Sequence, residues 1–371
     1  MSALGIIFSN IHNETIDELT RKRTSASIPF GGRYRLIDFA LSNFVNANIS
    51  TVGVLTQKNY QSLMDHLGSG KDWDLSRKNG GLIIFPPYSS HRSDFLYENR
   101  FEALVSVNSY VSKRHEDYVV LTDCDNVNAV DFTDVLQKHE ENNADITIVY
   151  RNQVVTEDLE DHMTFELDPS GRVTKATLKA KVGEQAKVAI NVWVINRRLL
   201  QGLLVDAATT GAKSFQRDVL FANVKALKIY GYQYDGIYLH MDSMENYFKG
   251  NMLLLTESVR SELFGNPNKR IYTKVRDSAP TRYGKDAIVQ NSFIADGCEI
   301  EGTVINSVLF RGVRVAKGTV VKNSILMQDT IVGTACNLDH VITDKNVSIR
   351  DRNNLMGCEK VPYYLGKYTT V

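Results

Sequence analysis

The segment Ser27–Asn48 holds the residues whose types and spacing are best suited to chemistry. It begins with a Pro-Phe-Gly-Gly turn, and Arg33, Arg35 and Asp38 follow among apolar residues. Paired glycines let a backbone approach a ligand at positive φ, and arginines bind phosphate through charge-assisted hydrogen bonds. The pattern suits a phosphate-binding mouth. It equally suits an ordinary surface loop leading into a helix, because a basic glycine-rich loop is a weak signal.

Short apolar runs alternate with helical patterns over the first part of the chain. The expected strands are Leu4–Phe8, Thr51–Thr56, Tyr118–Thr122 and Asp145–Tyr150. Strands that alternate with helices predict βαβ units and a mainly parallel sheet. Ligands of such sheets bind at the carboxyl ends of the strands, so the residues just after Phe8, Thr56 and Thr122 are candidates for a site.

From Ala287 onward the pattern changes, and aliphatic residues recur every five to six positions with Gly, Asn and Asp between them. The series includes Ile288, Ile294, Ile300, Val315, Val320, Ile325, Ile331, Val341 and Val347. Such a period predicts a hexapeptide-repeat β-helix, in which each short side contributes an inward aliphatic. The alternative is an antiparallel meander, but the persistent period favours the β-helix.

These patterns divide the chain into a domain at residues 1–262, a linker at 263–286 and a β-helix domain at 287–371. An amphipathic run, Glu245–Glu262, is expected to close the first domain. The stretch Asn266–Pro280 holds two prolines and mixed charge, as linkers do.

Composition limits the functional classes. The 371 residues include 43 Lys+Arg and 43 Asp+Glu, which argues against a nucleic-acid or membrane surface as the main partner. The four cysteines (Cys124, Cys298, Cys336 and Cys358) have no CxxC spacing, so free thiols in a reducing cytosol are expected. No signal peptide or membrane-spanning run is recognisable, and we expect a cytoplasmic protein.

Three stretches are similar to one enzyme family. PFGGRYRLIDFALSN resembles the signature of bacterial and plant glucose-1-phosphate adenylyltransferases, which make ADP-glucose for glycogen or starch. WDLSRKNGGLIIFPPY and IADGCEIEGTVINSVLFRGVRV resemble further parts of the same family, so the similarity spans nearly the whole chain. It implies an α/β fold, with an N-terminal Rossmann-like (GT-A-like) nucleotidyltransferase domain followed by a left-handed parallel β-helix.

The family's triphosphate-binding residues are changed in this chain. Relatives carry a GGxGxR loop after the first strand, where this chain has the glycine-free run Asn10–Thr15. Glu14 places a carboxylate where phosphate charge belongs, and Thr15 replaces the arginine. The lysine and proline of a second motif are Ser25 and Ala26 here. The resemblance therefore implies weakened triphosphate contacts.

The family's magnesium site is also altered. Two aspartates supply hard oxygen ligands for Mg²⁺ in relatives. Asp125 falls on the first position, but His240 falls on the second, and Asp242 lies two residues further on. We therefore expect Asp125 to be a vestigial catalytic residue, no metal to be bound productively here, and Mg²⁺ to be needed by a catalytic partner.

Other family positions are kept in part. Gln57 and Tyr97 match nucleotide-binding residues, although the Gly-Thr pair after that tyrosine is Asn99-Arg100 here. Lys179 matches the lysine that binds the sugar phosphate, and Asn191 replaces a glycine beside the sugar ring. These residues are expected to form a residual binding site.

The basic residues near the first motif resemble a regulatory region. Lys22 and Arg23 match a part of relatives that contributes to effector binding. Together with Arg33 and Arg35 they are the candidate effector or phosphate ligands.

Loss of catalytic residues with retention of folding motifs is similar to GlgD-type subunits, which have little or no activity alone and assemble with a catalytic partner of the same fold. Our leading hypothesis is a regulatory, non-catalytic or weakly catalytic subunit in a heterotetramer, with a homo-oligomer as the form of the chain alone. One alternative is a competent adenylyltransferase with an atypical phosphate loop. Another is a sugar-phosphate-binding scaffold outside glycogen metabolism.

An aliphatic cluster in the β-helix suggests where a partner binds. It consists of Val304, Ile305, Val308, Leu309 and Phe310. The cluster is too dense for one inward row, so alternation predicts that some members point outward and form a contact surface. The alternative is that a neighbouring segment of the chain covers them.

Overall fold

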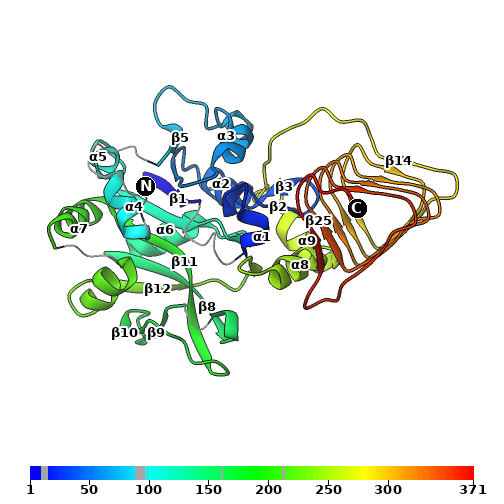
Figure 1. Ribbon diagram of the computed structural model, residues 1–371. Helices are drawn as coiled ribbons and strands as arrows, with labels where there is room; N and C mark the ends of the chain where they lie inside the picture. Colours follow the sequence, from blue (N-terminus) through cyan, green and yellow to red (C-terminus); the bar gives the residue numbers. More distant parts are fainter. Residues whose placement is uncertain (10–15, 88–96, 98, 160–161, 211–213) are drawn as a thin grey trace. The chain divides into compact units, whose positions relative to one another are not determined.

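The structure is a computed structural model that describes residues 1–9, 16–87, 97, 99–159, 162–210 and 214–371 (Figure 1). Its contacts define two compact units. The first, which we call the sheet unit, comprises Met1–Ile11, Ala40–Cys124 and Ala129–Gly236. The second, the β-helix unit, comprises His12–Phe39, Asp125–Asn128 and Ile237–Val371. These units follow contacts through space, so the domain boundaries expected along the sequence stay predictions.

The sheet unit contains a nine-stranded mixed sheet with the order β10-β9-β11-β6-β1-β4-β5, and with β8 paired to β11 and β12. Its strands are β1 (Ala3–Phe8), β4 (Thr51–Leu55), β5 (Gly81–Phe85), β6 (Tyr118–Asp123), β8 (Ile146–Val154), β9 (Thr164–Leu167), β10 (Val173–Thr177), β11 (Gln185–Asn196) and β12 (Ile229–Gln233). The strands β6, β1, β4 and β5 are parallel to one another. The parallel sheet expected from the alternating pattern is therefore present, and β11 continues it in the antiparallel sense.

Helices connect these strands (Figure 1). They are α2 (Leu36–Asn46), α3 (Gln61–Leu67), η3 (Lys71–Trp73), α4 (Arg100–Ser106), α5 (Asn108–Ser112), α6 (Phe132–Glu141), η4 (Glu157–Leu159), α7 (Arg197–Thr210) and the π-helix η5 (Phe215–Phe221). The core of the unit is rich in aromatic residues, and the Trp193 ring lies 5.7 Å from that of Phe215. Strands buried on both faces explain why their sequences read as continuous apolar runs.

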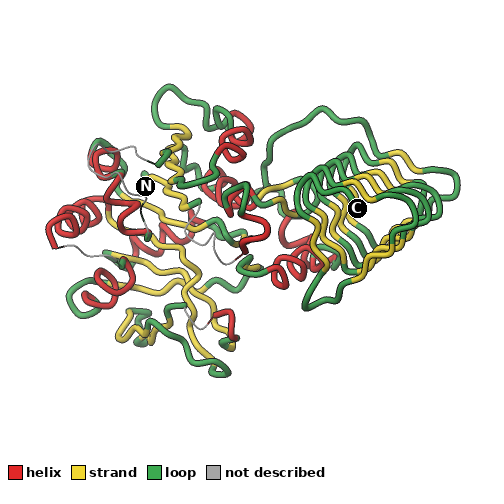
Figure 2. The backbone as a smooth tube through the Cα atoms, viewed as in Figure 1, coloured by secondary structure: helices red, strands yellow, loops and turns green. Residues whose placement is uncertain are grey.

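Three parallel five-stranded sheets form the β-helix, seen as stacked strands in Figure 2. The first sheet is β14 (Arg282–Tyr283), β17 (Glu299–Ile300), β20 (Arg314–Val315), β23 (Ile331–Val332) and β26 (Ser348–Ile349). The second is β15 (Ile288–Gln290), β18 (Thr303–Ile305), β21 (Val320–Lys322), β24 (Asn337–Asp339) and β27 (Asn354–Met356). The third is β16 (Phe293–Ile294), β19 (Val308–Leu309), β22 (Ile325–Leu326), β25 (Val341–Thr343) and β28 (Tyr363–Leu365). The β-helix predicted from the aliphatic period is confirmed.

Two members of that series differ from the expectation. Ile288 is 57% exposed and Ile331 is 46% exposed, while Val332, the neighbour of Ile331, is buried. Successive side chains of a strand point to opposite faces, so Val332 is the inward residue at this turn. Where two aliphatic residues are adjacent, the period alone cannot show which of them points inward.

The remaining elements of the β-helix unit come from separate parts of the chain. They are α1 (Asp17–Thr20), η2 (Ser25–Ser27), the hairpin β2 (Pro29–Phe30) and β3 (Tyr34–Arg35), the pair β7 (Asn126–Asn128) and β13 (Tyr238–His240), and the helices α8 (Met244–Leu253) and α9 (Glu257–Phe264). Together with the β-helix they enclose a second apolar core. Among the described residues, no helix has the length and apolar character needed to span a bilayer.

The Pro-Phe-Gly-Gly turn joins β2 to β3 and is packed tightly. Gly31 and Gly32 have φ values of 58° and 77°, a region that glycine enters without strain. The Gly31 N–H donates to Asn251 Oδ1 at 3.0 Å, and a Cβ on Gly31 would lie 2.9 Å from Leu254 Cδ1. The positive φ values therefore account for glycine at both positions of this turn.

The aliphatic cluster of the β-helix is not an exposed surface, so that prediction is wrong. Val304 and Leu309 are buried in the β-helix core. Val308 and Phe310 are buried in the second core, together with Phe248 of α8. The chain covers this face with its own helices, because the third sheet carries apolar side chains on both of its faces.

This burial predicts that Phe310→Asp unfolds the chain rather than only weakening an assembly. Truncating a buried Phe costs about 3–5 kcal/mol, and an unpaired buried carboxylate adds to the loss. Ile331→Asp is the control, because exposed substitutions usually change stability by about 0.5 kcal/mol or less. Chemical denaturation of both variants measures the difference, and equal stabilities would contradict the packing described.

Candidate functional site

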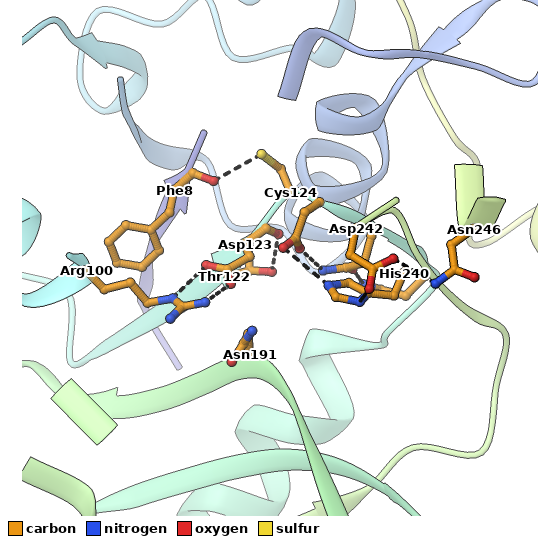
Figure 3. Close-up of polar contacts among 12 residues, drawn as sticks. Phe8, Arg100, Thr122, Asp123, Cys124, Asn191, His240, Asp242 and Asn246 are labelled. Atoms are coloured by element: carbon orange, nitrogen blue, oxygen red, sulfur yellow. Dashed lines mark hydrogen bonds and ion pairs between the residues drawn. The ribbon is translucent and has the colours of Figure 1, made fainter. Parts of the chain in front are cut away.

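The strand order of the parallel sheet reverses between β1 and β6. The chain proceeds from β1 to β4 and β5 on one side, and then returns to place β6 on the other. Ligands of open α/β sheets bind outside the strand ends at such a switch point. Phe8 is in register with Asp123 here, and the Cys124 thiol donates to the Phe8 carbonyl oxygen at 3.0 Å (Figure 3). Phe8 is also in register with Leu55 at the end of β4, so all three expected strand ends meet at the predicted edge.

A buried ion pair lies at this edge of the sheet unit (Figure 3). Arg100 Nε donates to Asp123 Oδ1 at 3.0 Å, and Nη2 bonds to Oδ2. The guanidinium carbon lies 5.5 Å from the centre of the Trp193 ring. The Asn99 side chain caps α4 by accepting from the amides of Phe101 and Glu102, and this cap fixes Arg100 as the first helical residue. Sequence reasoning missed Asp123, although an acidic residue at a strand end is a usable signal.

Asp125 and His240 are brought together in the β-helix unit by the antiparallel pair β7 and β13. The register places His240 opposite Asn126, and the Met241 N–H donates to the Asp125 carbonyl at 2.8 Å. His240 Nε2 is 3.5 Å from Asp125 Oδ2, and Nδ1 is 3.6 Å from Asp242 Oδ2 (Figure 3). The imidazole ring therefore contacts one carboxylate on each side.

This donor set does not fit Mg²⁺. The ion demands near-octahedral oxygen ligands at about 2.0–2.1 Å, whereas here a ring lies between the two carboxylates. Within the described part of the chain, no group of three or more His, Cys, Asp or Glu side chains could hold a metal ion. The expectation that this chain uses no metal productively stays a prediction, now with a geometric reason.

The candidate nucleotide and sugar residues lie in the sheet unit. Gln57 Nε2 donates to the Tyr97 carbonyl oxygen, so these two are brought together, and burial raises the pKa of the Tyr97 hydroxyl. Lys179 is exposed between β10 and β11. Asn191 has a φ of 57° at an irregularity of β11. Glycine and asparagine both tolerate that conformation, which explains why asparagine can replace glycine there. Asn10–Thr15 lies outside the described residues.

A cluster of basic residues lies in the β-helix unit. Arg23 Nη2 is 2.6 Å from both carboxylate oxygens of Asp344, and Arg23 Nη1 has no hydrogen-bond partner among the described residues. Burial lowers the pKa of Lys345 well below its usual value, and the positive charges of Arg35 and Arg23 lower it further. The structure thus brings Arg23 and Arg35 together and adds Asp344 and Lys345, for which the local sequence gives no signal.

The two other basic candidates are more exposed. The Lys22 ammonium lies 5.8 Å from the centre of the Tyr368 ring, and the Arg33 guanidinium lies 6.0 Å from that of Tyr34. Both are surface residues, so they can meet an anion from solvent. Their role as effector ligands stays a prediction.

Comparison with known proteins decides the family. A nucleotidyl transferase model matches residues 15–233, and a GlmU-like C-terminal hexapeptide model matches residues 277–360. The chain is 35% identical, over 98% of its length and 95% of the relative's, to glycogen biosynthesis protein GlgD of Bacillus subtilis (strain 168). It is 32% identical, over 87% of its length and 84% of the relative's, to glucose-1-phosphate adenylyltransferase of Clostridium botulinum (strain Eklund 17B / Type B). The chain belongs to the glucose-1-phosphate adenylyltransferase family. Within that family it is also 37% identical to GlgD of Geobacillus stearothermophilus, over 86% of this chain and 82% of the relative.

The ion pair between Arg100 and Asp123 gives a prediction about the stability of this family member. Arg100→Met leaves the Asp123 carboxylate buried without its guanidinium, which typically costs about 3–5 kcal/mol. The double variant Arg100→Met/Asp123→Asn should lose less, because no charge is then stranded. Arg77→Met is the control, since its ion pair with Asp74 is exposed and such pairs contribute about 0–1 kcal/mol. Urea denaturation at neutral pH measures all three, and equal losses for Arg100→Met and Arg77→Met would contradict the role given to burial.

Proposed function

We propose that this chain is a regulatory, non-catalytic or weakly catalytic subunit of glucose-1-phosphate adenylyltransferase. It supports formation of ADP-glucose and diphosphate from ATP and glucose 1-phosphate for glycogen biosynthesis. The observation that carries the proposal is the imidazole of His240 between Asp125 and Asp242. Nucleotidyl transfer needs a metal and positioned donors to stabilise charge on the reacting phosphate. In this arrangement the imidazole ring lies where a metal would have to contact both carboxylates.

The residues at the sheet edge support the same proposal. Asp123 places a carboxylate at the position where a parallel sheet binds its ligand, and Arg100 is already engaged in neutralising it. A guanidinium that holds a buried carboxylate is not available to a phosphate at the same time. Gln57, Tyr97 and Lys179 are the residues through which residual binding of nucleotide or sugar phosphate would occur.

Regulation is proposed to act through the basic cluster of the β-helix unit. Arg23 offers an unused donor, Nη1, and Arg35 adds positive charge beside the Lys345 amine. An anionic effector at this cluster, assisted by Lys22 and Arg33, would offset the repulsion among these cations. Because a nearby anion favours the charged form of an amine, binding would raise the pKa of Lys345 and take up a proton. Anion affinity should therefore increase as pH falls.

The proposed partner is a catalytic paralogue of the same fold. The GlgD and adenylyltransferase relatives each match most of this chain, so partners of shared architecture are available to form a closed symmetric assembly, here a heterotetramer. We propose a homo-oligomer for the chain alone and a cytoplasmic location. No disulfide bond joins the described cysteines, which suits a reducing compartment.

Kinetics of the separate and mixed proteins test the regulatory role. The chain alone should turn over ATP and glucose 1-phosphate at least about 10²–10³-fold more slowly than a typical kcat of about 10 s⁻¹, because catalytic donors are lost. Mixing it with the catalytic paralogue should change the rate or effector response of that enzyme. Asp125→Asn should leave the maximal rate of the mixture nearly unchanged.

Two other results would favour the alternatives. An ordinary turnover by the isolated chain, or loss of the mixture's activity in Asp125→Asn, would identify a competent adenylyltransferase with an atypical phosphate loop. Failure to bind or alter the paralogue would instead favour a sugar-phosphate-binding scaffold.

The basic cluster gives a separate prediction, with inorganic phosphate as the probe. Phosphate should raise the melting temperature of the chain by binding the folded state, and more strongly at lower pH. Lys345→Gln should reduce this rise, whereas Lys322→Gln, an exposed lysine on β21, should not. Sodium chloride at matched ionic strength is the control for screening. An unchanged response in Lys345→Gln would remove this lysine from the site.

A further inference from the structure

Backbone pairing fixes the position of the two carboxylates around His240. The strands β7 and β13 pair Asn126 with His240, and the amide of Met241 donates to the carbonyl of Asp125. A slip of one residue would turn every side chain of β13 to its other face. The register therefore holds His240 beside Asp125, and the chain then leads directly to Asp242.

Side-chain hydrogen bonds also orient both carboxylates toward the ring. Asn126 Nδ2 donates to Asp125 Oδ1 at 3.0 Å, and Asn246 Nδ2 donates to Asp242 Oδ1 at 2.7 Å. In each carboxylate the second oxygen, Oδ2, is then the one that contacts the imidazole. Figure 3 shows His240 with Asp242 and Asn246 beside it. Two oxygens from separate strand ends thus converge on one centre.

The centre is shielded from solvent. The side chains of Asp125, His240 and Asp242 are 4%, 12% and 15% exposed. Two carboxylates that face each other with little water between them repel strongly unless a group between them compensates or separates them. A divalent cation is one such group, and the ring of His240, which contacts both carboxylates, is another.

We propose that the imidazole of His240 takes the place of a divalent cation between Asp125 and Asp242. While the ring is present, it separates the two oxygens and prevents a metal from binding both. When the ring is removed, the two carboxylates form a cation-binding pair. Asp242 is then the second ligand, although it lies two residues beyond the position at which the family motif places one. The inference concerns this centre alone and holds whether or not the chain regulates a partner.

A cation-rescue experiment on the full chain tests the proposal, with Mn²⁺ as the probe. His240→Ala should lower the melting temperature, and Mn²⁺ should restore it in a concentration-dependent way. Titration followed by electron paramagnetic resonance should show one bound ion in this variant and none at this centre in the unaltered chain. Adding Asp242→Asn to His240→Ala should abolish both the binding and the rescue.

His139→Ala is the matched control. His139 is also buried, but it contacts the Thr147 hydroxyl, so Mn²⁺ should not rescue its loss. If His240→Ala does not fold even with Mn²⁺, His240→Asp is the deciding variant. It replaces the ring by a third carboxylate, so it should bind Mn²⁺ together with Asp125.

Three results would overturn the proposal. One is a Mn²⁺ site in the unaltered chain that Asp125→Asn removes. Another is a folded His240→Ala that neither binds Mn²⁺ nor is stabilised by it. The third is a folded His240→Asp without a Mn²⁺ site. None of these measurements depends on turnover or on a partner, so their failure is distinguishable from failure of the regulatory role.

Discussion

Buried charge must be compensated nearby, and in the β-helix unit the ion pair between Arg23 and Asp344 does this. Both side chains are almost fully buried, and breaking such a pair strands a charge in the interior. The pair links the segment before the β2–β3 hairpin to the turn after β25. The hydroxyl of Tyr364, on β28, donates to the same carboxylate. The attachment of the N-terminal hairpin to the β-helix therefore depends on this contact and on the apolar core around it.

The need to compensate buried charge also explains why side chains of the chain itself contact the carboxylates of the candidate sites. At the sheet edge the buried carboxylate of Asp123 is matched by Arg100, and between β7 and β13 two carboxylates meet one imidazole. At both places the chain's own side chains lie against the buried carboxylates. In the basic cluster, by contrast, positive charges adjoin one another, and those of Arg35 and Arg23 lower the pKa of Lys345.

Much of the fold could be predicted from the sequence, because the spacing of apolar residues along the chain reflects which side chains are buried. The apolar runs located the parallel strands, and the aliphatic period located the β-helix. Alternation correctly placed side chains on both faces of the third sheet, but the inference that the outward ones, such as Phe310, are exposed failed because helices of the same unit cover that face. Asp344 and Lys345 could not be found, since their importance arises only when segments distant in sequence come together. Asp242 lies two residues beyond the family position, so only the structure could show that it contacts the same ring as Asp125.

The β-helix unit is assembled from three separated stretches of chain, and this has a consequence for its synthesis. Arg23 and Asp344 are 321 positions apart, so the hairpin leaves the ribosome long before its partner surface exists. Translation proceeds at about 5–20 residues per second, which leaves apolar residues such as Phe30 uncovered for tens of seconds at the slower rates. Contacts of such long range also close slowly. The N-terminal segment is therefore the part of a nascent chain that most needs protection by chaperones.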